Sequence, residues 1–219
     1  MRAVARTRTG SLGRLSAEQR EALRAECGSL AALDDVEFGV RLLANTPTHE
    51  GRDPAVLRRW ASAATEFGAE ALRPEVAASA RDGVAIRELT GGLDPDQLLL
   101  ARFRSRPTPT VELFTDTLAL ADELVELLGW QAWFPPGSTR QAAIVHEEAH
   151  ERLHHDKALR AALKQRVGHR VLRGRLAAYV AGADELAAHA AAQQALGLQR
   201  SPLLLTAALA RAAEIVREN

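Results

Sequence analysis

The sequence predicts a predominantly helical α+β protein in which a small antiparallel sheet packs against helices. Two observations support this fold class. Apolar residues recur at spacings of three and four over most of the chain, which is typical of amphipathic helices. Three short β-rich segments between residues 84 and 115 are bounded by glycine and proline. With 219 residues, the chain is long enough for one good core, or for one core with a small appended subdomain.

The composition matches an ordinary globular protein and argues against several classes of function. The formal net charge is 0 and aromatic residues make up 4% of the chain, so neither a basic field nor a base-stacking surface indicates nucleic-acid binding. No apolar stretch approaches the length of a membrane span. Cys27 is the only cysteine, which excludes an intramolecular disulfide and a cysteine-based zinc site. We expect a cytoplasmic protein with no nucleic-acid or membrane partner, and the sequence predicts no particular oligomeric state.

The first 80 residues are expected to contain a basic arm and a helical subdomain. Residues 1–14 carry four arginines without periodicity and without a following apolar run, so we expect a flexible arm rather than a secretory signal. Residues 15–80 are expected to form a helical N-terminal subdomain. Its three predicted helices start at a capping box of Ser16 and Gln19, at Asp34 or Asp35, and at Asp53 followed by Pro54.

Residues 81–219 are predicted to form a second domain, which begins with the sheet. The three predicted strands are residues 84–89, 98–104 and 110–115, of which the second also suits a helix. Five helices are predicted after them: residues 117–128, a helix starting at a capping box of Ser138 and Gln141, residues 157–166, a long helix from about 170 to 196, and residues 202–217.

The helix that starts at Ser138 carries the most informative motif of the chain. His146, Glu147 and His150 form an H-E-x-x-H pattern. Residues four apart lie on one face of a helix, so both imidazoles can reach a single metal ion. Glu147 then lies beside the metal without having to bind it, which is the position of a general base for an activated water. A solvated helix face that happens to carry histidines is the simpler alternative.

Catalytic zinc takes three protein ligands, so a third residue must join His146 and His150. Glu185 is the first candidate, because it lies on another helix among apolar residues, where a charged group tends to have a partner. The adjacent Asp184 is an alternative ligand. His189, four residues after Glu185, is placed to orient a ligand or to contact substrate.

Two further candidates follow the motif directly. Asp156 fits the spacing of metalloproteases whose third ligand comes after a sharp turn, but that turn needs glycine where this chain has Leu153. His154 lies about one turn too far along the helix to share an ion with the motif histidines. His154 and His155 are better explained as a polar helix end, which the helix dipole favours.

Residues 142–150, Ala-Ala-Ile-Val-His-Glu-Glu-Ala-His, and the later segment around Glu185 resemble the gluzincin-type zincin metallopeptidases. The chain is most similar to compact intracellular members related to phage-repressor-cleaving and radiation-response proteases, over roughly residues 84–198. The resemblance implies that residues 81–219 form a zincin-like metallopeptidase domain with an active-site helix. It also implies a peptide or protein substrate and a zinc ion held by His146, His150 and Glu185, with Glu147 as the base.

The predicted function is zinc-dependent hydrolysis, most simply of peptides, in which Glu147 accepts a proton as water attacks a carbonyl. Tyr179 and His169 lie in the right region for an oxyanion stabiliser, although ordinary packing or surface roles suit both better. Two other functions stay open. Glu147 and His150 also match the Glu-x-x-His spacing of dimetal helical bundles. A non-catalytic helical module that keeps a zincin-like fold is the third hypothesis.

Overall fold

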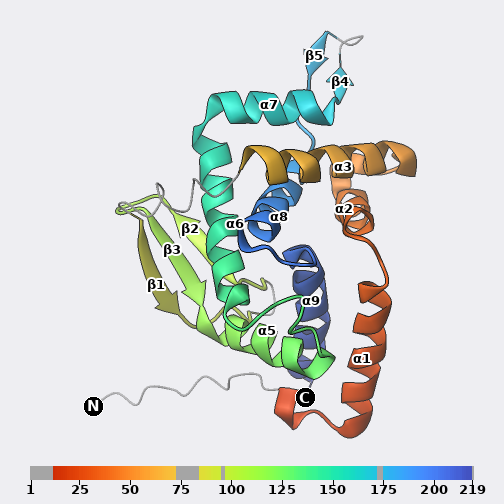
Figure 1. Cartoon of the computed structure of the whole chain (residues 1–219), viewed down its shortest axis with the longest axis vertical. Coiled ribbons are helices and arrows are strands. Elements are labelled where there is room, and N and C mark those ends of the chain that lie inside the picture. Colours follow the sequence, from red (N-terminus) through yellow and green to blue (C-terminus); the bar gives the residue numbers. More distant parts are fainter. Residues whose placement is uncertain (1–11, 73–83, 95–96, 172–174, 219) are drawn as a thin grey trace.

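The computed structural model describes residues 12–72, 84–94, 97–171 and 175–218. Helices make up most of this part of the chain, and a small sheet packs against them (Figure 1), which confirms the predicted fold class. The helices are η1 (Leu12–Arg14), α1 (Ala17–Ala31), α2 (Asp35–Ala44), η2 (Pro47–His49), α3 (Pro54–Ala71), α5 (Thr115–Leu128), α6 (Ser138–His155), α7 (Lys157–Val167), α8 (Ala183–Leu196) and α9 (Pro202–Glu218). The strands are β1 (Ala85–Leu89), β2 (Ala101–Arg104), β3 (Thr110–Phe114), β4 (Arg170–Val171) and β5 (Leu176–Ala177).

The N-terminal helices begin where the sequence predicts, because polar side chains satisfy their first N–H groups. Ser16 Oγ accepts from the N–H of Gln19 at 3.1 Å, and the N–H of Ser16 donates to Gln19 Oε1 at 2.9 Å. This confirms the predicted capping box. The carboxylates of Asp34 and Asp53 likewise accept from the first turns of α2 and α3.

The N-terminal helices pack against elements from the other end of the chain. Helix α1 packs against α9, and α3 packs along α8. The N–H of Leu12 donates to Glu123 Oε2 on α5 at 2.7 Å, and the Leu12 side chain is buried. Residues 1–11 of the predicted basic arm and residues 73–83, which span the predicted domain boundary, lie outside the described residues.

The three predicted strands form one sheet with the order β1-β3-β2, so the ambiguous second segment is a strand. The prediction of an antiparallel sheet holds for β2 and β3 but is wrong for β1 and β3, which are parallel. The chain reverses its direction once between β1 and β2, where Leu93 and Leu98 form an antiparallel bridge, and again between β2 and β3. Two reversals leave β1 and β3 running the same way, and the sheet is therefore mixed.

Helix α6 lies between the sheet on one side and α8 on the other (Figure 1). It contributes to all three groups of buried apolar side chains. Ile144 lies in the core under the sheet, Val145 in the core formed with α1, α5 and α9, and Ala149 in the core formed with α3, α7 and α8. A helix packed on several sides holds the polar residues of its remaining face in defined directions.

The start of α6 differs from the prediction. Gly137 rather than Ser138 is the N-cap residue, with a φ of 81°. Ser138 is the first helical residue, and its N–H donates to the carbonyl of Pro135 at 2.9 Å. Because the left-handed backbone at Gly137 turns the chain out of a proline-containing loop, Ser138 does not adopt the extended conformation that a capping box needs.

The predicted long helix from residue 170 to 196 is wrong in its first half. The hairpin of β4 and β5 follows α7, and α8 begins only at Ala183. Gly182 has a φ of 84°, and a Cβ at this position would lie 2.7 Å from Leu42 Cδ2. This left-handed residue separates α8 from the preceding segment. Glu185 therefore lies in the first turn of α8, where the helix dipole favours a negative charge.

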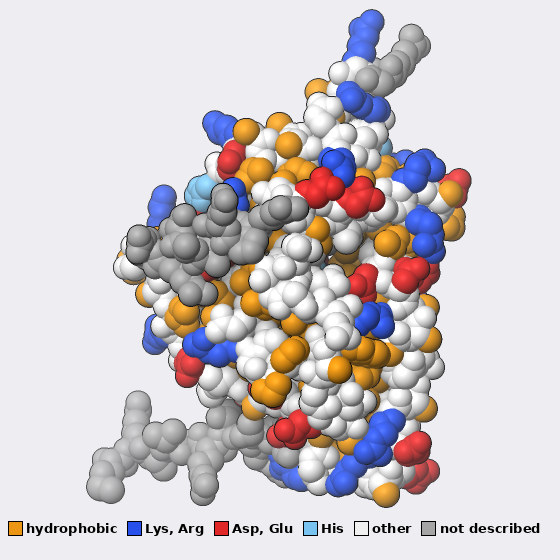
Figure 2. Space-filling model, viewed as in Figure 1, with side chains coloured by type: hydrophobic (Ala, Val, Ile, Leu, Met, Phe, Trp, Pro, Cys, Tyr) orange, Lys and Arg blue, Asp and Glu red, His pale blue; other side chains and the backbone are white. Residues whose placement is uncertain are grey.

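The surface carries charges of both signs. Lys, Arg, Asp and Glu side chains are interspersed over the face shown in Figure 2, in keeping with the formal net charge of 0. Among the described helices, none has the length and apolar character needed to cross a membrane.

The contact between α3 and α8 predicts a large effect of Gly68→Ala. A Cβ at Gly68 would lie 2.1 Å from the backbone oxygen of Ala187, so the helices must move apart. We expect the free energy of unfolding to fall by about 1–3 kcal/mol, measured by urea denaturation. Gly28→Ala in α1 is the matched control: nothing lies within 4 Å of its added Cβ. Alanine there should stabilise by about 0.5–1 kcal/mol through helix propensity, and stabilisation by both substitutions would contradict this packing.

Candidate metal centre

Helix α6 presents two imidazoles to α8. His146 and His150 are one helical turn apart and lie on the same face, as their spacing predicts. Their side chains are 15% and 27% exposed, so both are accessible only in part. The ring centroids of His146 and His150 are 4.7 Å apart. The motif histidines are therefore placed together at the junction of α6 and α8.

Helix α8 supplies a second pair at the same spacing, Glu185 and His189. The Glu185 carboxylate lies among three imidazoles: Oε1 is 3.4 Å from His146 Nε2 and 3.1 Å from His189 Nε2, and Oε2 is 2.9 Å from His150 Nε2. The structure thus brings together the three predicted metal-binding residues, and it adds His189 to the same cluster.

Small residues allow the two helices to approach closely. Ala149 on α6 and Ala188 on α8 are buried in the same core. Gly182 sets the first turn of α8, and with it the position of the Glu185 carboxylate. The positions of the four polar side chains therefore depend on the packing of α6 against α8. These helices are distant in sequence: His150 and Glu185 are 35 residues apart.

The pKa directions show that the cluster is strongly coupled. Burial and the nearby His189 lower the pKa of His146. Burial also acts against protonation of His150, but the hydrogen bond and charge of Glu185 outweigh it and raise the His150 pKa. Partial burial would raise the pKa of Glu185, yet hydrogen bonds with the three imidazoles hold that pKa far below its ordinary range. The carboxylate is therefore ionised, and of His146 and His150 it is His150 that more readily holds a proton.

Glu147 points toward the sheet rather than into the cluster. Its Oε2 accepts a hydrogen bond from the backbone N–H of Phe103 on β2 at 2.9 Å. Strand β2 is an edge strand of the sheet, and this N–H is one of its outward-facing groups. Glu147 nevertheless lines the same cavity as His146 and His150, so a molecule held at the imidazoles would lie next to its carboxylate.

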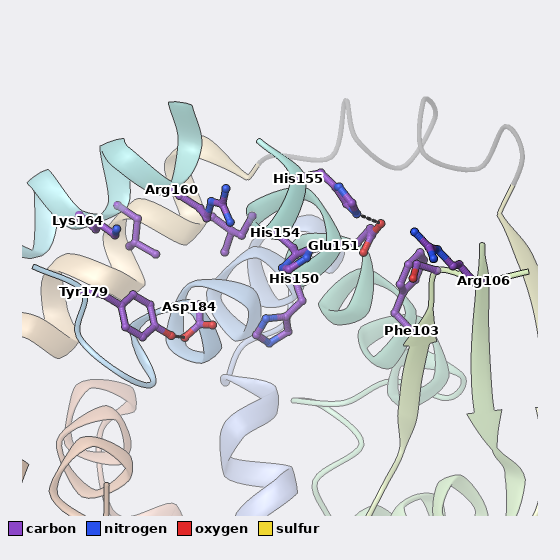
Figure 3. Close-up of a pocket in the computed structure, with 13 residues that line it drawn as sticks. Phe103, Arg106, His150, Glu151, His154, His155, Arg160, Lys164, Tyr179 and Asp184 are labelled. Carbon is purple, nitrogen blue, oxygen red and sulfur yellow. Dashed lines mark hydrogen bonds and ion pairs between the residues drawn. The ribbon is translucent and has the colours of Figure 1, made fainter. Parts of the chain in front are cut away.

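Two cavities meet at His150. The first, here called the inner pocket, has a volume of about 270 Å³ and is bordered by the cluster and by Glu147. Its other walls are mainly apolar and include Leu100, Phe134, Ala143, Leu205 and Leu209. The second, here called the outer cleft, has a volume of about 650 Å³. It is lined by Phe103, Arg106, His150, His154, Arg160, Lys164, Tyr179 and Asp184, among others (Figure 3).

The remaining predicted candidates lie outside the cluster. Asp156 caps α7 by accepting from two backbone N–H groups. Asp184 accepts from the Tyr179 hydroxyl at 2.7 Å beside the outer cleft, and both burial and this bond raise the pKa of Tyr179 (Figure 3). His169 packs on Trp60, with ring centroids 4.8 Å apart. His155 pairs with Glu151 at 2.7 Å in the last turns of α6.

Several contributors to the site have no motif that reveals them in advance. The N–H of Phe103 is a backbone group, and only the tertiary fold brings it to Glu147. The apolar wall from α9 is likewise distant in sequence from the motif. Arg160 and Lys164 have a detectable signal, since their spacing of four places them on one face of α7.

The donor groups of the cluster fit a zinc ion. Zinc prefers imidazole nitrogens and carboxylate oxygens when cysteine is lacking. His146, Glu185 and His189 each offer a ligand atom, and these atoms lie within 4.8 Å of one another. His150 reaches the same carboxylate. One feature departs from ordinary zinc sites: the buried Nδ1 atoms of His146 and His189 have no hydrogen-bond partner among the described residues, whereas metal-binding histidines usually donate from their second nitrogen.

No protein-family model, curated protein or solved structure matches this chain. Its function is therefore inferred from its own residues and their geometry.

The Glu185 cluster predicts a pH-dependent stability in metal-free protein. The raised His150 pKa gives stability that is present below its ordinary value of 6.5 and is lost as the pH rises through the raised value. The lowered Glu185 pKa gives stability that is present above 4.5 and is lost only at lower pH. We expect the difference in unfolding free energy between wild type and Glu185→Gln to be largest between these values and to shrink above pH 6.5.

Urea unfolding in the presence of a chelator measures this difference. Glu88→Gln is the control, because Glu88 pairs with an arginine, Arg140, and not with a histidine. If the loss of unfolding free energy in Glu185→Gln varies with pH no more than the loss in Glu88→Gln, the coupling between Glu185 and His150 is contradicted.

Proposed function

We propose that the protein is a zinc-dependent hydrolase, and specifically a metallopeptidase with Glu147 as general base. The observation that carries the proposal is the convergence of His146, His150 and Glu185 from two helices, with Glu147 lining the same cavity. The resemblance of residues 142–150 to gluzincin-type zincins points to the same chemistry.

His146, His150 and Glu185 would hold the ion, and His189 is available as a further ligand or as a donor to the Glu185 carboxylate. A zinc ion bound there would lower the pKa of a water molecule and polarise a carbonyl group. Glu147 would accept a proton from the attacking water and return it to the amide nitrogen as the C–N bond breaks. Phe103 orients the Glu147 carboxylate through its backbone N–H.

A peptide is the favoured substrate because of the surroundings of the cluster. The outer edge of β2 has no strand partner within the described part of the sheet. Glu147 accepts from the Phe103 N–H there, and an extended peptide can pair with the remaining groups of this edge. The apolar walls of the inner pocket suit an apolar side chain next to the bond that is cleaved. A small polar substrate would not use the strand edge or the apolar walls.

A non-catalytic helical module is the second candidate. One observation favours it: the Glu185 carboxylate already contacts the Nε2 atoms of three imidazoles, so its charge has partners without an ion. Under this alternative, the polar contacts of the cluster would hold α6 against α8 without binding a metal.

Glu147→Gln tests the role of the base. Glutamine keeps an oxygen that can accept from Phe103, so the fold and the ligand set should be retained. We expect hydrolysis of a denatured-protein substrate, with cleavage sites mapped by mass spectrometry, to fall by about 10²–10⁴-fold. Metal content and the thermal melting curve serve as controls. Full hydrolytic activity in this variant would exclude Glu147 as the base.

Metal analysis of purified protein separates the candidate functions. We expect one zinc per chain, and a loss of zinc in His146→Ala and in Glu185→Ala, because each substitution removes a ligand from one cluster. The dimetal alternative instead requires two irons per chain with visible absorption. Protein that binds no metal, even after exposure to zinc, would favour the non-catalytic module.

A further inference from the structure

The outer cleft contains cations that the proposed chemistry does not use. Arg160 and Lys164 reach it from α7, and Arg106 reaches it from the far wall, two residues after the end of β2 (Figure 3). The cleft is continuous with the candidate site, because His150 lines both cavities. A ligand in the outer cleft would therefore extend to the imidazole cluster.

These three cations have no anionic partner among the described residues. Both carboxylates that line the cleft are already engaged: Glu151 pairs with His155 at 2.7 Å, and Asp184 accepts from Tyr179 at 2.7 Å. Elsewhere on the described surface, arginines commonly do find carboxylates. Such pairs are Arg58 with Glu37, Arg102 with Glu112, Arg140 with Glu88, and Arg166 with Glu66 and Glu70.

The arrangement of the three cations makes the cleft positive from more than one wall. Arg160 and Lys164 lie on one face of α7, line the cleft and are each partly buried. Glu151 and Asp184 also line the cleft, so its three cations exceed its carboxylates by one, and this local excess of positive charge favours anionic ligands. The chain as a whole has a formal net charge of 0, so this is a local property of the cleft.

We propose that the outer cleft binds an acidic segment of a peptide substrate, with Arg106, Arg160 and Lys164 as the groups that recognise its carboxylates. A peptide is favoured over other anions because the outer edge of β2, which has no strand partner in the described sheet, leads toward Arg106. A peptide extended along β2 thus reaches the imidazole cluster and the cations together. That the bound peptide is a substrate rests on the proposed function, whereas its binding to the outer cleft does not require hydrolysis.

Binding of matched peptides tests the inference. Each peptide carries a central leucine and, before or after it, a run of aspartates or the same run as asparagines. Fluorescence anisotropy with the Glu147→Gln protein measures affinity without turnover. We expect an aspartate peptide to bind about three- to tenfold more tightly than its asparagine counterpart at low salt. The preference should weaken as salt is added, because exposed charges are screened.

The double variant Arg160→Gln and Lys164→Gln, in the same background, should remove most of this preference. Lys157→Gln is the matched control, since Lys157 is an exposed cation of α7 that does not line the cleft. Thermal melting verifies that all variants are folded. Equal affinity for both kinds of peptide, no detectable binding of the aspartate peptides, or a preference that persists in the double variant would overturn the inference.

Two further outcomes are informative. A single-stranded oligonucleotide that binds more tightly than the aspartate peptides and displaces them would replace the peptide by a nucleic acid and so overturn the inference. If the aspartate preference holds but wild-type protein hydrolyses no peptide, the cleft stands and the proposed function fails. If hydrolysis occurs with no preference for the aspartate peptides, the function stands and the inference about the cleft fails.

Discussion

The contact between the Glu185 carboxylate and three imidazoles is the interaction on which the arrangement of this protein depends. A partly buried charge needs partners, and here the partners come from two helices that are distant in sequence. The contact requires α6 and α8 to lie close together, and small buried residues such as Ala149 and Ala188 permit this. It also requires α8 to begin at Ala183, because this start positions Glu185 in its first turn.

The position of α6 explains why a polar cluster can be held in place inside an otherwise apolar structure. Its side chains contribute to three cores, so its rotation and its position along the axis are constrained from several sides. The same constraint directs His146 and His150 to α8 and Glu147 to β2. Helix α6 therefore directs its two imidazoles and the Glu147 carboxylate to different neighbours, although all three side chains line the inner pocket.

The two cavities divide the surroundings of the cluster by chemistry. The inner pocket has mainly apolar walls, some of them from α9, whereas the outer cleft is lined by several charged residues, including cations with no anionic partner among the described residues. His150 lies between them and has the raised pKa of the cluster. A ligand that spans both cavities would present an apolar group on one side of His150 and an acidic group on the other, a combination that peptides offer readily.

Local patterns in the sequence were enough to predict the helices that have clear caps, the three strands, and the facing of His146 and His150, because these depend on spacing and on neighbours within a few residues. Two glycines with positive φ account for differences from the prediction: Gly137 takes the N-cap position in place of Ser138, and Gly182 immediately precedes α8, which begins at Ala183 rather than at about residue 170. The parallel pairing of β1 with β3 was also missed, since strand order depends on the path of the whole chain.

The sequence by itself determined a helical protein with an H-E-x-x-H helix and an acidic candidate on a later helix. Only the tertiary structure decided that Glu185, rather than Asp184 or Asp156, meets the imidazoles, and that His189 joins them. It also decided the partner of Glu147 and the placement of cations beside the site. The physical reason is that periodicity fixes which face of a helix a residue occupies, whereas packing between distant elements decides what that face meets.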